Sequence, residues 1–106
     1  MEKTIYKIEE KEIELKLDLE RNTVCATQNE IAKLFDVGRN WITRQISMEE
    51  RKGGLDPSVC SYLEHTGTDN KVYKFKHYSL NLTLEIGYKI DVNKALQFKE
   101  WASNLF

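Results

Sequence analysis

The chain has 106 residues, of which 41% are hydrophobic and 10% aromatic, and its formal net charge is −1. This length allows one domain with a modest core, and the composition is that of a folded chain rather than a disordered one. A near-neutral charge argues against indiscriminate binding to nucleic acid. No apolar run approaches the length of a membrane span and no signal-peptide pattern is present at the start, so we expect a cytoplasmic protein with no membrane contact.

The first segment predicts a small antiparallel sheet. Residues 5–8 look like a strand, and residues 13–19 alternate apolar and charged side chains. The apolar set on one face of this second strand is Ile13, Leu15, Leu17 and Leu19. A turn at 20–22 then leads into a short return strand over 23–26. Because Met1 to Glu20 holds seven acidic and four basic residues, we expect this sheet to pack against the helices and to lie away from any DNA.

Residues 27–47 predict two short helices joined by a tight turn. Thr27 and Glu30 form a capping box, in which each side chain accepts a hydrogen bond from a backbone N–H at the helix start. Apolar residues then recur at helical spacing in the first helix. In the second helix, Ile42 and Ile46 lie about one turn apart and face inward. This spacing is typical of a helix-turn-helix.

Two residues of the turn differ from the usual helix-turn-helix pattern. Asp36 stands where glycine is most common, although aspartate adopts the left-handed conformation more readily than most residues. Gly38 replaces the serine or threonine that usually caps the second helix, which predicts a loss of stability on the order of a few tenths of a kcal/mol. The helix-turn-helix pattern is still recognisable, but these two residues predict that it recognises a less sharply defined DNA sequence.

Residues 59–78 predict a β-hairpin, after a loop that contains the only proline, Pro57. Strand-like runs at 59–66 and 72–78 flank Gly67 to Asn70, which is rich in turn-forming residues. Three lysines and no acidic residue occur within 71–76. A hairpin directly after a helix-turn-helix is the wing of a winged helix, whose lysines would lie near phosphates. The same lysines would also point outward on any solvated strand.

The remainder, residues 79–106, predicts two helices. Ser79 caps the first, which runs to about residue 88 with Leu80, Leu84 and Ile86 buried. Residues 91–93 interrupt it. The last helix carries an apolar stripe of Ala95, Phe98, Trp101, Ala102 and Leu105, so its aromatic residues are expected in the core rather than at a ligand. The complete prediction is one α+β domain over 1–106, a winged helix-turn-helix with a small N-terminal antiparallel sheet and two C-terminal helices.

Three segments follow one another in an order that is typical of a known family: TVCATQNEIAKLFDVGRNWITRQI, LDPSVCSYLEHTGTDNKVYKFKHYSL and IGYKIDVNKALQFKEWAS. In this order they resemble the N-terminal part of the RhuM family of bacterial proteins and, more distantly, the N-terminal domains of phage antirepressors. The resemblance extends from about Glu12 to Ala102. It implies a DNA-binding regulatory module found in bacterial or mobile-element DNA, and it implies a C-terminal partner domain that this chain lacks.

We expect the second helix, 39–47, to enter the major groove of double-stranded DNA. Residues near the start of such a helix normally read bases, so Arg39, Asn40 and Thr43 are predicted base contacts and Arg44 a phosphate contact. Trp41 is expected to pack in the core or on the wing, with a base contact as the alternative. The predicted DNA-binding residues are Gln28, Arg39, Asn40, Thr43, Arg44, Lys71, Lys74 and Lys76. A palindromic DNA target would imply that the chain acts as a homodimer.

No catalytic triad, glycine-rich phosphate loop or paired-carboxylate motif is present in the sequence, so we predict neither an enzyme nor a cofactor. Cys25, Cys60, His65 and His77 lack metal-ligand spacing, so we predict no metal site and expect reduced thiols in a cytosol. The competing hypothesis is a winged-helix module that docks a protein, such as a repressor or a partner domain, through the same surfaces.

Overall fold

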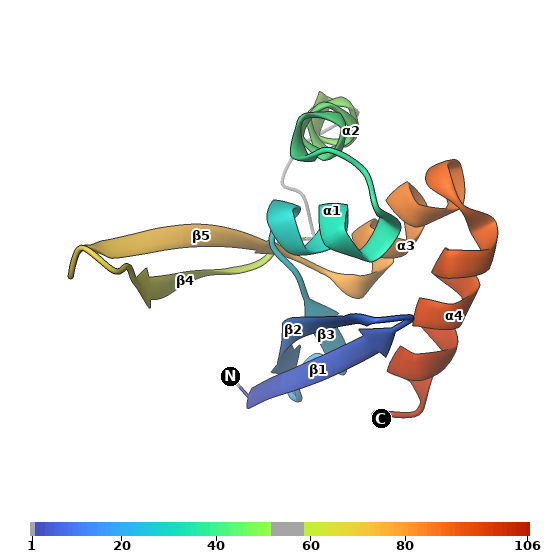
Figure 1. Ribbon diagram of the computed structural model, residues 1–106, viewed down its shortest axis with the longest axis horizontal. Helices are drawn as coiled ribbons and strands as arrows, with labels where there is room; N and C mark the ends of the chain where they lie inside the picture. Colours follow the sequence, from blue (N-terminus) through green and yellow to red (C-terminus); the bar gives the residue numbers. More distant parts are fainter. Residues whose placement is uncertain (1, 52–58) are drawn as a thin grey trace.

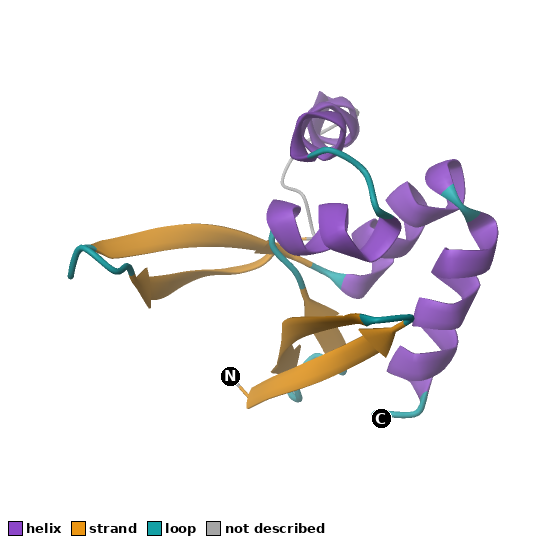
Figure 2. Ribbon diagram, in the orientation of Figure 1, coloured by secondary structure: helices purple, strands orange, loops and turns teal. Residues whose placement is uncertain are grey.

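The structure is a computed structural model that describes residues 2–51 and 59–106; for 59–66 and Lys74 it describes the backbone alone. These residues form a mixed α+β fold with a three-stranded antiparallel sheet, a two-stranded hairpin and four helices. The hairpin extends to one side of the helices (Figure 1), and the sheet lies beneath them (Figure 2). The predicted α+β class is confirmed, whereas the loop around Pro57 lies outside the described residues. None of the described helices has the length and apolar character that a bilayer crossing requires.

The sheet consists of β1 (Glu2–Ile8), β2 (Lys11–Asp18) and β3 (Thr23–Cys25) in sequence order. Tyr6 pairs with Ile13 across β1 and β2, so these side chains share a face, and both are buried. The opposite face of the β1–β2 ladder carries exposed ion pairs. The prediction that Leu19 belongs to the buried face is wrong: β2 ends at Asp18, and Leu19 is 53% exposed.

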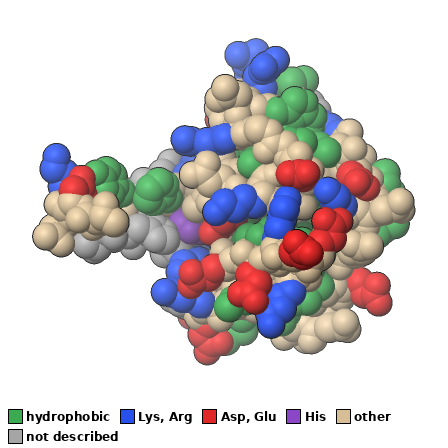
Figure 3. Space-filling view, in the orientation of Figure 1, with side chains coloured by type: hydrophobic (Ala, Val, Ile, Leu, Met, Phe, Trp, Pro, Cys, Tyr) green, Lys and Arg blue, Asp and Glu red, His purple; other side chains and the backbone are tan. Residues whose placement is uncertain are grey.

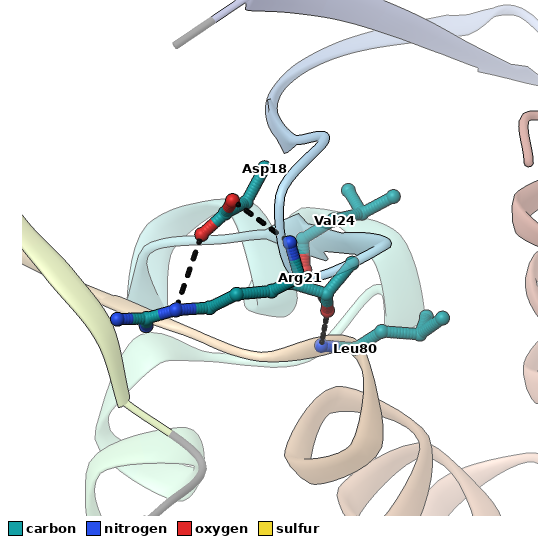
Figure 4. A network of polar contacts seen from close by, with 5 residues as sticks. Asp18, Arg21, Val24 and Leu80 are labelled. Atoms are coloured by element: carbon teal, nitrogen blue, oxygen red, sulfur yellow. Dashed lines mark hydrogen bonds and ion pairs between the residues drawn. The ribbon is translucent and has the colours of Figure 1, made fainter.

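The start of β3, directly after the turn from β2, ties the sheet to the first residue of the helix α3 (Leu80–Ile90). The Asp18 carboxylate accepts a hydrogen bond from the Arg21 N–H at 3.2 Å and lies 3.7 Å from the Arg21 Nε (Figure 4). The hydroxyl of Thr23 accepts the Leu80 N–H at 3.1 Å. Since the first N–H groups of a helix have no partner within it, this bond satisfies one of them and holds α3 beside the sheet.

The two helices predicted after the sheet are α1 (Gln28–Phe35) and α2 (Arg39–Arg51), and α2 is longer than the predicted 39–47. The capping box is confirmed: the Thr27 hydroxyl accepts the Glu30 N–H at 3.2 Å, and the Glu30 carboxylate accepts the Thr27 N–H at 2.9 Å. Asp36 ends α1 in the left-handed conformation, with φ 55° and ψ 49°. Figure 1 shows α2 nearly end-on where α1 lies across the view, so the two helices cross steeply.

The hairpin consists of β4 (Val59–Thr66) and β5 (Val72–Tyr78), at the predicted bounds. The turn is closed by a hydrogen bond from the Gly67 N–H to the Lys71 carbonyl at 2.8 Å. At the other end, Tyr78 exchanges two backbone hydrogen bonds with Ala26, at 2.8 and 2.9 Å. The base of the hairpin is therefore joined to the residue that precedes the capping box of α1.

The C-terminal helices are α3 and α4 (Val92–Ser103). The predicted Ser79 cap is confirmed, since its hydroxyl accepts the Leu82 N–H at 3.4 Å. The interruption is shorter than predicted, because Asp91 alone separates the helices and its carboxylate caps α4. Leu84 and Ile86 are buried as expected, whereas Leu80 is only half-buried.

Aromatic and small residues join these helices to the rest of the core. The Phe98 ring lies 5.1 Å from Tyr6 and 5.6 Å from Trp101, measured between ring centroids, which attaches α4 to β1 and confirms the predicted packing role of both aromatic residues of α4. Gly87 of α3 lies against Phe35 of α1. A Cβ atom at Gly87 would stand 2.6 Å from the Phe35 Cε1, so only glycine allows this approach.

The expectation of reduced thiols is wrong for Cys25, which is disulfide-bonded and fully buried. Its position in the sequence carried no sign of this, because the spacing of cysteines along a chain does not show which sulfur atoms the fold brings into bonding distance.

Candidate nucleic-acid interface

The polar face of α2 points away from the core, as the helical spacing predicts. Ile42 and Ile46 are the buried residues of this helix, while Arg39, Asn40, Thr43 and Arg44 are exposed. Figure 3 shows Lys and Arg side chains at the top of the molecule, over α2, and acidic side chains lower on the same face, mixed with further Lys and Arg side chains. The outer face of α2 is thus exposed, polar and basic near its N-terminus.

The two arginines of this face have no acidic partner among the residues that the structure describes. Arg39 lies in the first turn of α2 and Arg44 five residues later. A guanidinium group presents five donors in a planar fork that matches a carboxylate, a phosphate or a guanine edge. The guanidinium groups of Arg39 and Arg44 are therefore exposed and available to donate hydrogen bonds to an anionic ligand.

Thr43 and Gln28 are not independent contacts, because the structure joins them. The Thr43 hydroxyl lies 2.6 Å from the Gln28 Oε1 and 3.1 Å from the Arg39 carbonyl, and its single hydrogen serves one of these acceptors at a time. With its hydrogen donated, the Thr43 hydroxyl can only accept further hydrogen bonds. A phosphate oxygen also accepts, so Thr43 suits a thymine methyl better than the phosphate that was its other predicted contact.

Gln28 continues this connection to the hairpin, since its Nε2 donates to the Tyr78 hydroxyl at 3.3 Å. Gln28 is half-buried at the start of α1, and Tyr78 is 2% exposed at the end of β5. The three side chains come from three elements and meet beside the exposed face of α2. Tyr78 was not among the predicted site residues, because strand alternation places it on the side of Lys74 and Lys76 and gives no sign that it is buried beside Gln28.

The three predicted lysines of the hairpin have different environments. Lys71 is exposed near the turn, and the side chain of Lys74 lies outside the described residues. Lys76 is half-buried: its Nζ lies 2.9 Å from the Glu50 Oε1 and 5.4 Å from the centroid of the Tyr78 ring. Lys76 therefore connects β5 to α2, and it would have to leave Glu50 to reach a phosphate.

The tip of the hairpin also carries a negative charge. The Asp69 carboxylate accepts hydrogen bonds from the Tyr73 hydroxyl at 2.5 Å and from the Lys71 N–H at 3.0 Å. These bonds, the tyrosine bond first, hold the pKa of Asp69 below its usual value. The carboxylate thus stays charged beside Lys71 and partly offsets the positive charge that the sequence placed there.

Two acidic residues attach the C-terminal half of α2 to its neighbours. Glu50 pairs with Lys76 of β5, and Glu49 lies 3.2 Å from the Nζ of Lys89 on α3. Neither pair could be predicted from the sequence, because the partners are 26 and 40 residues apart and no local pattern relates them.

The remaining candidates have structural environments. Trp41 is half-buried and packs against the core, in agreement with the packing role expected for it. His77 is fully buried, and its Nδ1 lies 2.9 Å from the Phe75 carbonyl. Within 2–51 and 67–106, where side chains other than Lys74 are described, no group of three His, Cys, Asp or Glu residues is placed to hold a metal ion. The side chains of Cys60 and His65 lie outside the described residues.

Comparison of the chain with protein-family models, with curated proteins and with solved structures gives no match in any of the three. The candidate site therefore depends on its own residues and their geometry.

Proposed function

We propose that the chain is a double-stranded DNA-binding module, part of a transcription regulator of bacterial or mobile-element origin. In this proposal α1 and α2 form a helix-turn-helix, α2 enters the major groove, and the β4–β5 hairpin is the wing. The resemblance to the RhuM family supports the same reading. The proposed role is binding, and it requires no catalytic residue.

One observation carries the proposal: α2 exposes Arg39, Asn40 and Arg44 on the face opposite its buried isoleucines, and the two arginines have no acidic partner among the described residues. Arginine pairs with guanine and asparagine with adenine through two hydrogen bonds each, and a major groove admits one helix. A helix that keeps such donors exposed and unneutralised suits an anionic, hydrogen-bonding ligand.

The distribution of charge agrees with a local rather than a general affinity for DNA. The net charge is −1, and lysines of the sheet such as Lys3 and Lys7 pair with Glu14 and Glu12 at 3.4 and 3.8 Å. Phosphates are attracted to charge that the protein has not already neutralised. Arg39 and Arg44 of α2 meet this condition among the described residues, whereas Lys71 meets it only in part because the Asp69 carboxylate lies beside it.

The experiment is fluorescence anisotropy with labelled duplex DNA, first a random pool and then a sequence selected from it. Wild-type affinity should fall with salt by a slope of about −0.9 per phosphate contact. The double variant R39A/R44A should lose binding, because each lost arginine contact costs about 1–3 kcal/mol. The control K3A/K7A removes the same charge from the sheet and should bind as the wild type does. Equal binding by R39A/R44A and wild type would contradict the assignment of α2.

The hairpin supports one second candidate function, a protein-docking module. Val72, Tyr73 and Phe75 are 60%, 42% and 40% exposed. Aromatic side chains on a surface are enriched at protein interfaces. A folded wild-type chain with no measurable affinity for duplex DNA at low salt would favour this candidate, and V72S/Y73S should then weaken binding to the protein partner while R39A/R44A should not.

A further inference from the structure

We propose that Tyr78 is a positioning residue that sets the β4–β5 hairpin against α2. The inference rests on the proposed function, because both elements would contact one DNA duplex. Tyr78 itself is buried and touches no ligand in this proposal. Its effect is transmitted through three neighbours: Ala26, Gln28 and Lys76.

The backbone of Tyr78 fixes the base of the hairpin. Its N–H and carbonyl bond to Ala26 at 2.8 and 2.9 Å, immediately before the cap of α1. These bonds place the end of β5, but they leave the tilt of α2 undetermined. The side chain of Tyr78 makes the connections to α2 that its backbone does not make.

The Tyr78 hydroxyl reaches the N-terminal half of α2 through Gln28. The Gln28 Nε2 donates to the Tyr78 hydroxyl at 3.3 Å, and the Gln28 Oε1 accepts from the Thr43 hydroxyl at 2.6 Å. An amide side chain has one donor end and one acceptor end, so Gln28 can bridge two hydroxyl groups in this way. The connection joins β5, α1 and α2 in one line of hydrogen bonds.

The Tyr78 ring reaches the C-terminal half of α2 through Lys76. The Lys76 Nζ lies 5.4 Å from the ring centroid and 2.9 Å from the Glu50 Oε1. A cation within about 6 Å of a tyrosine ring is attracted to its face. Lys76 is thereby held between the ring and α2.

The two connections meet α2 at Thr43 and Glu50, which are about 10 Å apart along the helix axis at about 1.5 Å per residue. The buried residues of α2 are Ile42 and Ile46, with the half-buried Trp41 beside them, and the Glu49–Lys89 ion pair joins the helix to α3. The attachments at Thr43 and Glu50 are the ones that join α2 to β5, so they set the tilt of α2 relative to the hairpin. Contacts to base edges tolerate displacements of only about 0.5 Å, so this tilt matters for reading DNA.

The test is Tyr78→Phe in the full chain, which removes one oxygen and keeps the ring and the backbone bonds. Discrimination between the selected duplex and a scrambled one should fall by about tenfold, roughly the loss of one base-pair contact. Affinity for the scrambled duplex and its salt slope should not change, because they depend on phosphate contacts. Gln28→Ala should lower discrimination to the same extent, and the double variant should be no worse than Gln28→Ala alone.

The matched control is Tyr6→Phe, which removes the hydroxyl of another buried tyrosine, in the cluster with Phe98 and Trp101. It should leave discrimination unchanged. Equal discrimination in wild type and Tyr78→Phe would overturn the inference, as would an equal loss in Tyr6→Phe.

A second measurement does not depend on DNA. Residual dipolar couplings of backbone N–H groups report the orientation of the hairpin relative to α2. This orientation should change in Tyr78→Phe and not in Tyr6→Phe; the wild-type orientation in Tyr78→Phe would overturn the inference. A wild-type chain that does not bind DNA would refute the proposed function, and these couplings would still decide the role of Tyr78.

Discussion

Half of α1 is buried, whereas α2 buries two of its thirteen residues, although the two helices are consecutive. Phe35 of α1 packs directly against Gly87 of α3. Two reciprocal hydrogen bonds between Thr27 and Glu30 cap the start of α1. The C-terminal half of α2 is instead attached by two ion pairs, through Glu49 and Glu50. Because α2 leaves its polar face exposed, ion pairs at its sides supply part of the attachment that burial supplies for α1.

The largest effect is expected where α1 meets α3. Gly87→Ala should destabilise the fold by about 1–3 kcal/mol, because its Cβ would stand 2.6 Å from a ring carbon of Phe35, which is 3% exposed and enclosed. Alanine also favours the helix by about 1 kcal/mol, which offsets only part of the loss. Urea unfolding measures the difference. Gly38→Ala, whose Cβ meets no atom within 4 Å, is the comparison: it should cost only what an alanine N-cap loses relative to glycine, about 0.5 kcal/mol. A variant as stable as the wild type would show that α1 is not tightly packed.

A smaller effect, dependent on salt, is expected for α2. Glu50→Gln breaks the ion pair with Lys76, whose partners are 41% and 29% exposed, so the loss should be below about 1 kcal/mol and should shrink at 1 M salt. Glu100→Gln on α4 is the control for removal of one negative charge. A loss that persists unchanged at high salt would mean that α2 is held by packing, as α1 is.

Gly38→Ser tests the start of α2 with a gain of stability. Serine supplies the side-chain acceptor that glycine lacks, and the open space at Gly38 admits it. The free energy of unfolding should rise by a few tenths of a kcal/mol, because serine is a slightly better N-cap than glycine. A fall in the urea midpoint would show that this position requires glycine.

The smallest effect concerns Asp36, between the two helices. A hydrogen bond from Lys11 at 3.2 Å, together with the charges of Lys11 and Lys94, lowers the pKa of Asp36. The folded state therefore favours the carboxylate; this preference is present above the ordinary pKa near 4 and is lost as the pH falls through the lowered pKa. In Lys11→Ala the pKa should rise toward its ordinary value, as measured by NMR titration of the carboxyl carbon. Asp69 should titrate unchanged, and an unchanged Asp36 would contradict the role of Lys11.

The sequence by itself determined the local features of this protein. The capping box at Thr27, the turn at Asp36, the hairpin turn and the outward direction of the polar residues of α2 all follow from patterns within a few residues. Backbone hydrogen bonds in turns and caps, and the periodicity of a helix, involve residues only a few positions apart, so the sequence alone shows which residues take part.

Tertiary structure alone decided which of the predicted residues work together. It joined Gln28 to Thr43 and to Tyr78, which is 50 residues away, and it placed Lys76 against Glu50. It also paired the sulfur of Cys25 in a disulfide. No sequence pattern encodes such contacts, because they arise when separate elements pack, and side chains at many positions satisfy the same periodicity.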